Sequence, residues 1–358
     1  MHQRVINISS PHANAWLRQF PDGDAVWDGW RFVFNQDEGS YDYLVVFDDL
    51  HAPLTLRCNP QNTIHLATEP PAAHQYAEPF LGQFAWAVTQ DKRVKHPGII
   101  YRQPGLTWFI GWKPGSGDDP AALSFDELAG LFDLPKTRLI SVIASNQTVL
   151  SGHVKRLQFA KRLKQHYGDQ IDFYGRGFKT MEDKLEALRD YRFNVVLENS
   201  SADDYFSEKF TDCVIAGAYP IYHGCPNLER YFPSGSFAWI DIGNFDSAVA
   251  VIDQAIAENR DQLKRQELRL ARDLAMHKHN LFPMLVELIS DIENGKYGKA
   301  AQPVALDEQV LPFRGKRYRA LYAPLFALPS RERLSELANE HVFFGFLRRV
   351  YKLMLRWM

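Results

Sequence analysis

Residues 191–224 read YRFNVVLENSSADDYFSEKFTDCVIAGAYPIYHG, with two apolar runs on either side of a polar stretch. The apolar run that ends at Asn199 predicts a buried strand, Tyr205–Ala216 predicts an amphipathic helix, and Tyr219–Gly224 predicts a second strand. A strand, helix and strand in this order indicate a parallel α/β sheet, in which ligands bind outside the carboxyl ends of the strands. The polar residues Glu198–Lys209 fall at that place.

The polar stretch covers the predicted first turn of the helix, where backbone N–H groups have no partner within the helix and point toward a bound anion. Helix capping is the simpler explanation, and any one of four side chains could supply it, namely Ser200, Ser201, Asp203 and Asp204. Capping requires only one of them. The remaining polar residues therefore favour a binding site.

The same alternation of strand and helix continues on both sides of this stretch. Upstream, the pattern predicts a strand at Leu139–Ala144, a helix at His153–Gly168, a strand at Ile171–Gly175 and a helix at Lys179–Tyr191. Further strands are predicted in the first half of the chain at Tyr41–Leu50, Asn62–Pro71 and Phe84–Asp91, and a short helix at Ser124–Phe132. We therefore expect a doubly wound α/β protein.

Length and composition indicate a soluble protein of two domains. The chain has 358 residues, of which 46% are apolar and 23% charged. A stretch rich in proline, glycine and aspartate, Lys113–Ala122, marks the expected domain boundary. The net charge of -2 argues against nucleic-acid binding. Three irregularly spaced cysteines, and an N-terminus without the apolar core of a signal peptide, favour a cytoplasmic location.

Four motifs in order resemble the donor-binding region of glycosyltransferase family 10, the α1,3/4-fucosyltransferases, in its bacterial type. They are VLENS at 196–200, YFSEK at 205–209, YPIYHGCPN at 219–227 and SFAWIDIGNF at 236–245. Leu197 stands where the family carries an aromatic residue. Weaker similarity extends to YGRGF at 174–178 and to TEPP at 68–71.

This resemblance implies a GT-B architecture, with two Rossmann-like domains facing each other across a cleft. Residues 1–125 would form the N-terminal, acceptor-binding domain and residues 136–300 the C-terminal, nucleotide-sugar-binding domain. Residues 301–358 would form a helical, basic amphipathic tail. The implied activity is that of a hexosyltransferase: an acceptor hydroxyl displaces GDP from GDP-fucose with inversion. Surface polysaccharide, O-antigen or capsule precursors, or a glycosylated protein, are the expected acceptors.

The resemblance also implies roles for six residues at the donor site. Lys209 and Arg156 would contact the diphosphate, Glu208 the ribose hydroxyls and Tyr205 a phosphate. Glu198 and Asn199 would hold the loop or the nucleotide. Without the resemblance, Arg156 would be interpreted as a solvated arginine on a helix that also carries Lys155, Lys161 and Arg162.

The catalytic base implied by the resemblance is Glu69, which follows a predicted strand and precedes Pro70 and Pro71. Capping of the next turn is the alternative explanation for this carboxylate. His65, His74, Asp48 and Asp49 are other candidates for the base.

We expect no required metal or cofactor, because cationic side chains are present for the leaving group and the adjacent acidic pairs are typical of turns. Those pairs are Asp48–Asp49, Asp118–Asp119 and Asp203–Asp204. Trp86 and Trp108 are candidates for an acceptor-binding surface, since rings pack on the apolar faces of sugars. Burial in the core is the ordinary explanation for such residues.

The final stretch, Val342–Met358, places apolar residues at helical spacing beside four basic residues and no acidic one. A basic amphipathic helix of this kind predicts peripheral attachment to an anionic membrane surface, at the inner face of the cell membrane, where a lipid-linked acceptor would lie. Packing on the protein's own core or on a second subunit is the alternative. A family member with a different nucleotide sugar, or a carbohydrate-binding module without activity, remain alternatives for the whole protein.

Overall fold

The computed structural model describes residues 3–11, 15–50, 54–70, 76–113, 122–146, 151–301 and 309–310. All of these residues lie in one compact unit, Met1–Leu311. Most of the predicted tail, 301–358, lies outside the described residues, and Val342–Met358 lies there entirely, so its helix and its membrane attachment stay predictions. Gln309–Val310, which the prediction placed in the helical tail, form a short strand instead.

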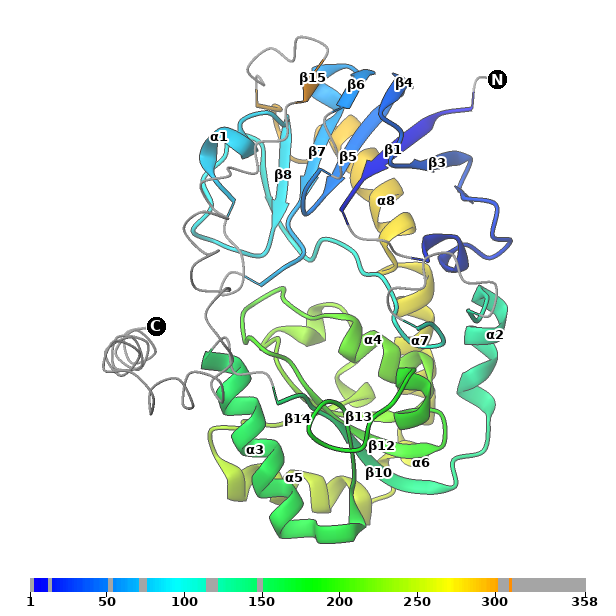
Figure 1. Cartoon of the computed structure of the whole chain (residues 1–358), viewed down its shortest axis with the longest axis vertical. Coiled ribbons are helices and arrows are strands. Elements are labelled where there is room, and N and C mark those ends of the chain that lie inside the picture. Colours follow the sequence, from blue (N-terminus) through cyan, green and yellow to red (C-terminus); the bar gives the residue numbers. More distant parts are fainter. Residues whose placement is uncertain are drawn as a thin grey trace, which may run out of the picture. The chain divides into compact units, whose positions relative to one another are not determined.

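The first half of the chain builds a sheet of seven strands within the described residues (Figure 1). Every neighbouring pair is parallel except β2 and β3, which form a hairpin at one edge. In spatial order the strands are β2 (Val26–Trp27), β3 (Trp30–Phe34), β1 (Val5–Ser9), β5 (Tyr43–Phe47), β7 (Thr63–Leu66), β8 (Trp86–Thr89) and β9 (Ile99–Tyr101).

The second half builds a sheet of five strands within the described residues, and every neighbouring pair is parallel. The order is β11 (Asp172–Tyr174), β10 (Arg138–Ile143), β12 (Tyr191–Leu197), β13 (Tyr219–His223) and β14 (Ala238–Trp239). Helices cover both faces, as a buried parallel sheet requires. On one face α3 (Ser151–Tyr167) contacts α5 (Phe245–Ala257) through the rings of Phe159 and Phe245, 5.8 Å apart. Helices α4 (Glu208–Ile215) and α7 (Arg265–His277) contact each other and belong to the same hydrophobic core, that of the second domain (Figure 1).

A small third sheet joins β15 (Gln309–Val310), β6 (Leu54–Arg57) and β4 (Glu38–Ser40). Because β15 pairs with β6, residues that follow the second domain along the chain return to the first. The remaining short helices are α1 (Glu78–Leu81), α2 (Phe125–Gly130) and α6 (Arg260–Leu263).

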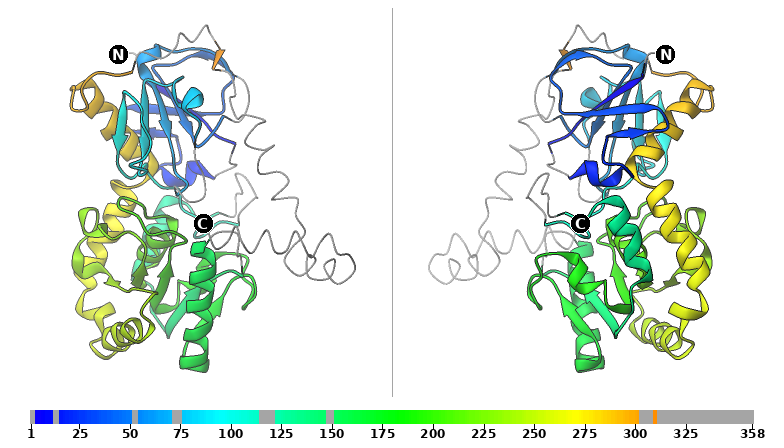
Figure 2. Two further views of the ribbon diagram at one scale, coloured as in Figure 1. Left: turned by 90° about the vertical axis from the view of Figure 1, so that its left-hand side faces the viewer. Right: turned by 90° about the vertical axis from the view of Figure 1, so that its right-hand side faces the viewer.

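Helix α8 (Leu281–Glu293) also returns to the first domain. Its apolar face packs in one core with the strands of the first sheet, through Leu281, Phe282, Met284, Leu285, Leu288 and Ile289 (Figure 2). Conversely, three residues that follow the first sheet along the chain pack in the core of the second domain, namely Leu106, Trp108 and Ile110. Packing therefore assigns α8 to the first domain and residues 106–110 and 125–132 to the second, which differs from the predicted bounds of 1–125 and 136–300.

The predicted α/β class with two doubly wound halves is confirmed. The expected strands are all present, with ends that differ by a few residues. The expected helix at Lys179–Tyr191 is wrong: the structure has a single 3-10 turn, Lys184–Ala187. Asp183 caps this turn and also accepts a hydrogen bond from the backbone of Gly111, so the segment holds the connection between the domains instead of extending as a helix.

No helix among the described residues is long and apolar enough to cross a membrane.

We predict that His279, at the junction of α7 and α8, makes the fold sensitive to acid. Its ring lies among Phe206, Tyr231 and Phe232, and its Nε2 is 3.0 Å from the carbonyl oxygen of Tyr231. Burial lowers the pKa of His279 to about 4. In the unfolded chain the His279 ring takes up a proton near pH 6.5, whereas in the folded chain it stays neutral until the pH approaches 4. The free energy of unfolding therefore keeps its full value above pH 6.5 and decreases by about 3 kcal/mol as the pH drops to 4.

Urea unfolding at several pH values between 7.5 and 4 measures this loss. In His279→Gln the loss between pH 6.5 and 4 should shrink by about 3 kcal/mol. The matched control is His166→Gln, an exposed histidine on α3. An unchanged pH dependence in His279→Gln would show that the acid sensitivity arises elsewhere.

Candidate donor site at the carboxyl edge of the second sheet

Strand β12 ends at Leu197, and the next residue, Glu198, is the buried anchor of the site. Its side chain is fully covered, and its carboxylate accepts hydrogen bonds from the backbone N–H and the hydroxyl of Ser207, each at 2.8 Å. Gly224, at the end of β13, makes this position possible, because a Cβ there would lie 2.5 Å from Cγ of Glu198. Glu198 therefore fixes the start of α4 from inside the protein. Of the two roles expected for it, this contact corresponds to holding the loop.

Helix α4 begins later than the sequence predicted, at Glu208 instead of Tyr205. The hydroxyl of Ser207 accepts from the backbone N–H of Lys209 and caps the helix, so none of the four expected capping residues does so. Asp204 instead joins two loops. It is buried and has a left-handed backbone conformation, and its carboxylate accepts hydrogen bonds from the side chains of Asn227, Arg230 and Tyr231, among others.

The first turn of α4 carries a run of paired charges. Lys209 Nζ lies 3.4 Å from Glu198 and 3.3 Å from Glu208, and it donates to the hydroxyl of Ser207 at 3.0 Å. Lys184 Nζ lies 3.0 Å from Glu208 and 2.9 Å from Asp212. Charges that are withdrawn from water persist only when paired in this way.

The neighbouring charges set the protonation states of this turn. Burial alone would raise the pKa of Glu208, but Lys184 and Lys209 outweigh it and hold that pKa well below its ordinary range. Burial likewise opposes the charge on Lys209, yet Glu208 and Glu198 raise the pKa of its ammonium group. Both side chains are therefore charged at neutral pH.

A second group of polar side chains reaches the site from α3. Gly152 brings the start of this helix against the backbone of Asn199, where a Cβ would lie 1.8 Å from the carbonyl oxygen. Asn199 in turn lies 3.4 Å from His153 Nε2 and accepts from the hydroxyl of Tyr205 at 2.9 Å. Tyr205 is buried, and this hydrogen bond holds the hydroxyl that was expected to donate to a phosphate.

Arg156 is buried on α3 and is not the solvated residue of the alternative interpretation. Its Nη2 donates to the hydroxyl of Ser145 at 3.1 Å, while its Nε is buried and has no partner among the described residues. Burial lowers the pKa of Arg156, and the negative charges of Glu198 and Glu208 oppose that effect. The structure thus brings together all six residues that the sequence analysis placed at the donor site.

Glu69 follows β7 in the first domain and is exposed. Burial raises the pKa of Tyr205 well above its usual value, and the carboxylates of Glu198, Glu208 and Glu69 raise it further. Glu69 therefore lies within electrostatic range of the donor-site phenol. Among the alternative bases, Asp48 is buried and accepts from Thr68 and from the hydroxyl of Tyr76.

His65 is also buried, with its Nε2 2.9 Å from the carbonyl oxygen of Asp48. Asp49 is buried and accepts from the backbone of Leu50. His74 and the pair Asp118–Asp119 lie outside the described residues. Of the described candidates for the base, only Glu69 is exposed.

Trp86 and Trp108 do not form an acceptor surface in this structure. Trp86 is buried in the first core and donates from its ring nitrogen to the carbonyl of Gln61, and Trp108 is buried in the second core against Phe125. Neither ring offers a face to a sugar. Their packing explains both residues, so the prediction of an acceptor surface is corrected to a structural role.

Lys184, Asp212 and His153 are site residues that the sequence analysis did not single out, and Ser207 entered it only as a member of the YFSEK motif. For Lys184 a local signal existed, because Asp183 and Glu186 form a capping pattern that marks the start of a turn. In the described part of the chain, no group of three or more His, Cys, Asp or Glu side chains is arranged to hold a metal ion. The expectation that no metal is required stays a prediction.

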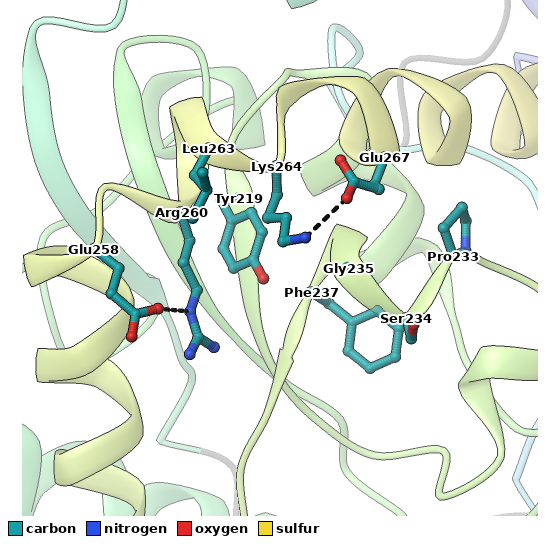
Figure 3. Close-up of a pocket in the computed structure, with 10 residues that line it drawn as sticks. All are labelled: Tyr219, Pro233, Ser234, Gly235, Phe237, Glu258, Arg260, Leu263, Lys264 and Glu267. Carbon is teal, nitrogen blue, oxygen red and sulfur yellow. Dashed lines mark hydrogen bonds and ion pairs between the residues drawn. The ribbon is translucent and has the colours of Figure 1, made fainter.

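A pocket of about 480 Å³ opens at a different place on the second domain (Figure 3). It is lined by Tyr219, the first residue of β13, and so lies at the amino edge of the sheet, opposite the carboxyl edge that carries the donor-site residues. Its two cations are each paired with a carboxylate, Arg260 with Glu258 and Lys264 with Glu267 (Figure 3).

Two Rossmann-like halves, with a charged cluster at the carboxyl edge of the second, define a protein of GT-B architecture. Residues 134–267 match the family model of glycosyltransferase family 10 (fucosyltransferase) C-term. Over these residues the chain is similar to glycosyltransferase family 10.

Individual fucosyltransferases are similar to parts of the chain as well. The 3-galactosyl-N-acetylglucosaminide 4-alpha-L-fucosyltransferase FUT3 of Pan troglodytes is 25% identical over 245 residues, which cover 67% of this chain and 57% of the relative. The alpha-(1,3)-fucosyltransferase FucT of Helicobacter pylori is 36% identical over 73 residues, which cover 20% of this chain and 15% of the relative. A crystal structure of an alpha1,3-fucosyltransferase with GDP has 17% identity and a TM-score of 0.48, over 81% of this chain and 91% of that chain.

The matched stretches span between 15% and 57% of the length of these curated relatives.

Proposed function

We propose that the protein is an inverting fucosyltransferase, which moves fucose from GDP-fucose to a hydroxyl of a glycan acceptor. The observation that carries the proposal is the convergence of Arg156, Tyr205, Glu208 and Lys209 around buried Glu198 at the carboxyl edge of the second sheet. Named relatives from several organisms are fucosyltransferases, which supports fucose as the sugar.

The chemistry of the site suits a nucleoside diphosphate. Arg156 and Lys209 are the cations that face the cluster from α3 and α4, and they would stabilise the charge that develops on the diphosphate as it leaves. Glu208 accepts hydrogen bonds but cannot donate them, so in a bound nucleotide it would face the ribose hydroxyls and not the phosphates. Buried Tyr205 would donate to a phosphate oxygen.

The charged side chains of the site balance one another in number. Three cations, Arg156, Lys184 and Lys209, stand against the carboxylates of Glu198, Glu208 and Asp212. Lys209 has longer contacts than Lys184, at 3.3 and 3.4 Å against 3.0 and 2.9 Å. Lys209 is therefore the cation that an incoming diphosphate would draw toward itself.

The acceptor hydroxyl would attack the anomeric carbon from the face opposite GDP while a base takes its proton. We propose Glu69 as this base, because it is exposed and acts electrostatically on Tyr205, whereas Asp48 and His65 are engaged inside the first domain. The acceptor is proposed to be a glycan of a surface polysaccharide or of a glycosylated protein.

We predict that Lys209→Ala and Arg156→Ala each lower kcat/KM for GDP-fucose by about 10²–10³-fold, because each removes one preorganised cation from the leaving group. Initial rates of GDP release in the presence of a glycan acceptor measure this, with GDP-mannose and a UDP-sugar run alongside. Lys161→Ala, an exposed lysine on the same helix as Arg156, is the matched control and should keep full activity. Full activity in both site variants would contradict the donor site, and faster turnover of another donor would replace fucose.

We predict that Glu69→Gln lowers transfer by about 10²–10⁴-fold while GDP affinity stays within about threefold of that of the wild type, because only proton removal is lost. Rates of glycosyl transfer and calorimetric titration with GDP separate the two effects. Asp49→Asn is the companion variant. Loss of transfer in Asp49→Asn, with Glu69→Gln still active, would move the base to Asp49.

A further inference from the structure

Lys184 lies outside the motifs that match the family's donor site, yet it is bound directly to that site. It begins the 3-10 turn Lys184–Ala187, and its Nζ lies 3.0 Å from Oε1 of Glu208 and 2.9 Å from Oδ2 of Asp212. Its side chain is only 19% exposed, and that of Asp212 is fully buried. The ion pairs of Lys184 are therefore largely shielded from water, where they are stronger than at the surface.

Two lysines hold the same oxygen of Glu208. Oε1 is 3.0 Å from Lys184 and 3.3 Å from Lys209, whereas Oε2 accepts no hydrogen bond from any described residue. Because the carboxyl group is planar, fixing Oε1 from two sides sets the direction in which Oε2 points. Oε2 is then the atom left to accept hydrogen bonds from a ligand.

Lys184 is itself held in place from the side away from Glu208. Asp212 lies one helical turn beyond Glu208 on α4, and its Oδ1 accepts from the backbone N–H of Phe109 at 3.1 Å. The ammonium group of Lys184 also lies 5.2 Å from the centre of the Phe109 ring. The segment between the two domains thus clamps the Lys184–Asp212 pair, which in turn orients Glu208.

We propose that Lys184 is a positioning residue, which orients Glu208 so that its Oε2 accepts from the ribose hydroxyls of the bound nucleotide. This proposal rests on the proposed function, since it needs a nucleotide at the donor site. Lys184 touches neither the ribose nor the phosphates in this account. Its effect is confined to the part of the binding affinity that the ribose hydroxyls supply.

The test compares two ligands, GDP and 2′,3′-dideoxy-GDP, which differ only in those hydroxyls. Calorimetric titration should show that the wild-type protein prefers GDP by about 10–100-fold, the range for hydrogen bonds to a charged acceptor. In Lys184→Met this preference should fall below about threefold, through weaker binding of GDP, while the affinity for the dideoxy ligand stays nearly constant. Glu208→Gln should show a similar loss of preference, and Lys184→Arg should recover most of it.

Lys136→Met is the matched control, because Lys136 is a half-buried lysine of the same domain, as Lys184 is. Lys136 donates to the carbonyl oxygens of Arg189 and Ala216 and has no contact with Glu208. Its substitution should leave the preference for GDP intact, even where the domain becomes less stable.

A second variant covers the case in which Lys184→Met does not fold. Lys184→Met combined with Asp212→Asn removes one positive and one negative charge together, so no unpaired charge of that pair remains buried. It should show the same loss of preference for GDP. A preference equal to that of the wild type, or equal weakening of both ligands, in these variants would overturn the role of Lys184. A wild-type protein that binds neither ligand would overturn the proposed function itself, and the inference with it.

Discussion

The site depends on a run of alternating charges that leads from α4 to the end of β12: Asp212, Lys184, Glu208, Lys209 and Glu198. Successive partners lie 2.9, 3.0, 3.3 and 3.4 Å apart. Removing an unpaired ion from water costs several kcal/mol, which is a large part of the free energy of unfolding of a domain, so each of these charges needs a partner. Each is held by its neighbours, so the first turn of α4 has one arrangement that satisfies all of them.

This run connects the parts of the site. At one end Asp212 accepts a hydrogen bond from the backbone N–H of Phe109, in the stretch of chain that leads from the first sheet to the second. At the other end Glu198 accepts hydrogen bonds from Ser207 and fixes the start of α4. The first turn of α4 is therefore held from both sides by direct contacts. Lys209, with its longer contacts, is the member that a bound anion would displace most easily.

Local sequence patterns predicted most of the fold, whereas the six donor-site residues came from the resemblance to glycosyltransferase family 10. Alternation of apolar runs with amphipathic segments was enough to locate the strands, and the polar stretch after Leu197 located the site, because both depend on neighbours in sequence. The role of Lys184 depends on contacts with residues 24 and 28 positions away, which no local pattern records. The same reason explains two errors: Trp86 and Trp108 are core residues because of distant packing partners, and α8 returns to the first domain although it follows the second in sequence.

We infer that this charged run binds the GDP part of a nucleotide sugar, and a crystal structure of the wild-type protein with GDP would show where the nucleotide lies. We expect the diphosphate within hydrogen-bond distance of Arg156 and Lys209, and the ribose hydroxyls facing Glu208. GDP seated instead in the pocket lined by Tyr219 and Lys264, or bound with its diphosphate away from both Arg156 and Lys209, would show that the charged run is not the GDP site.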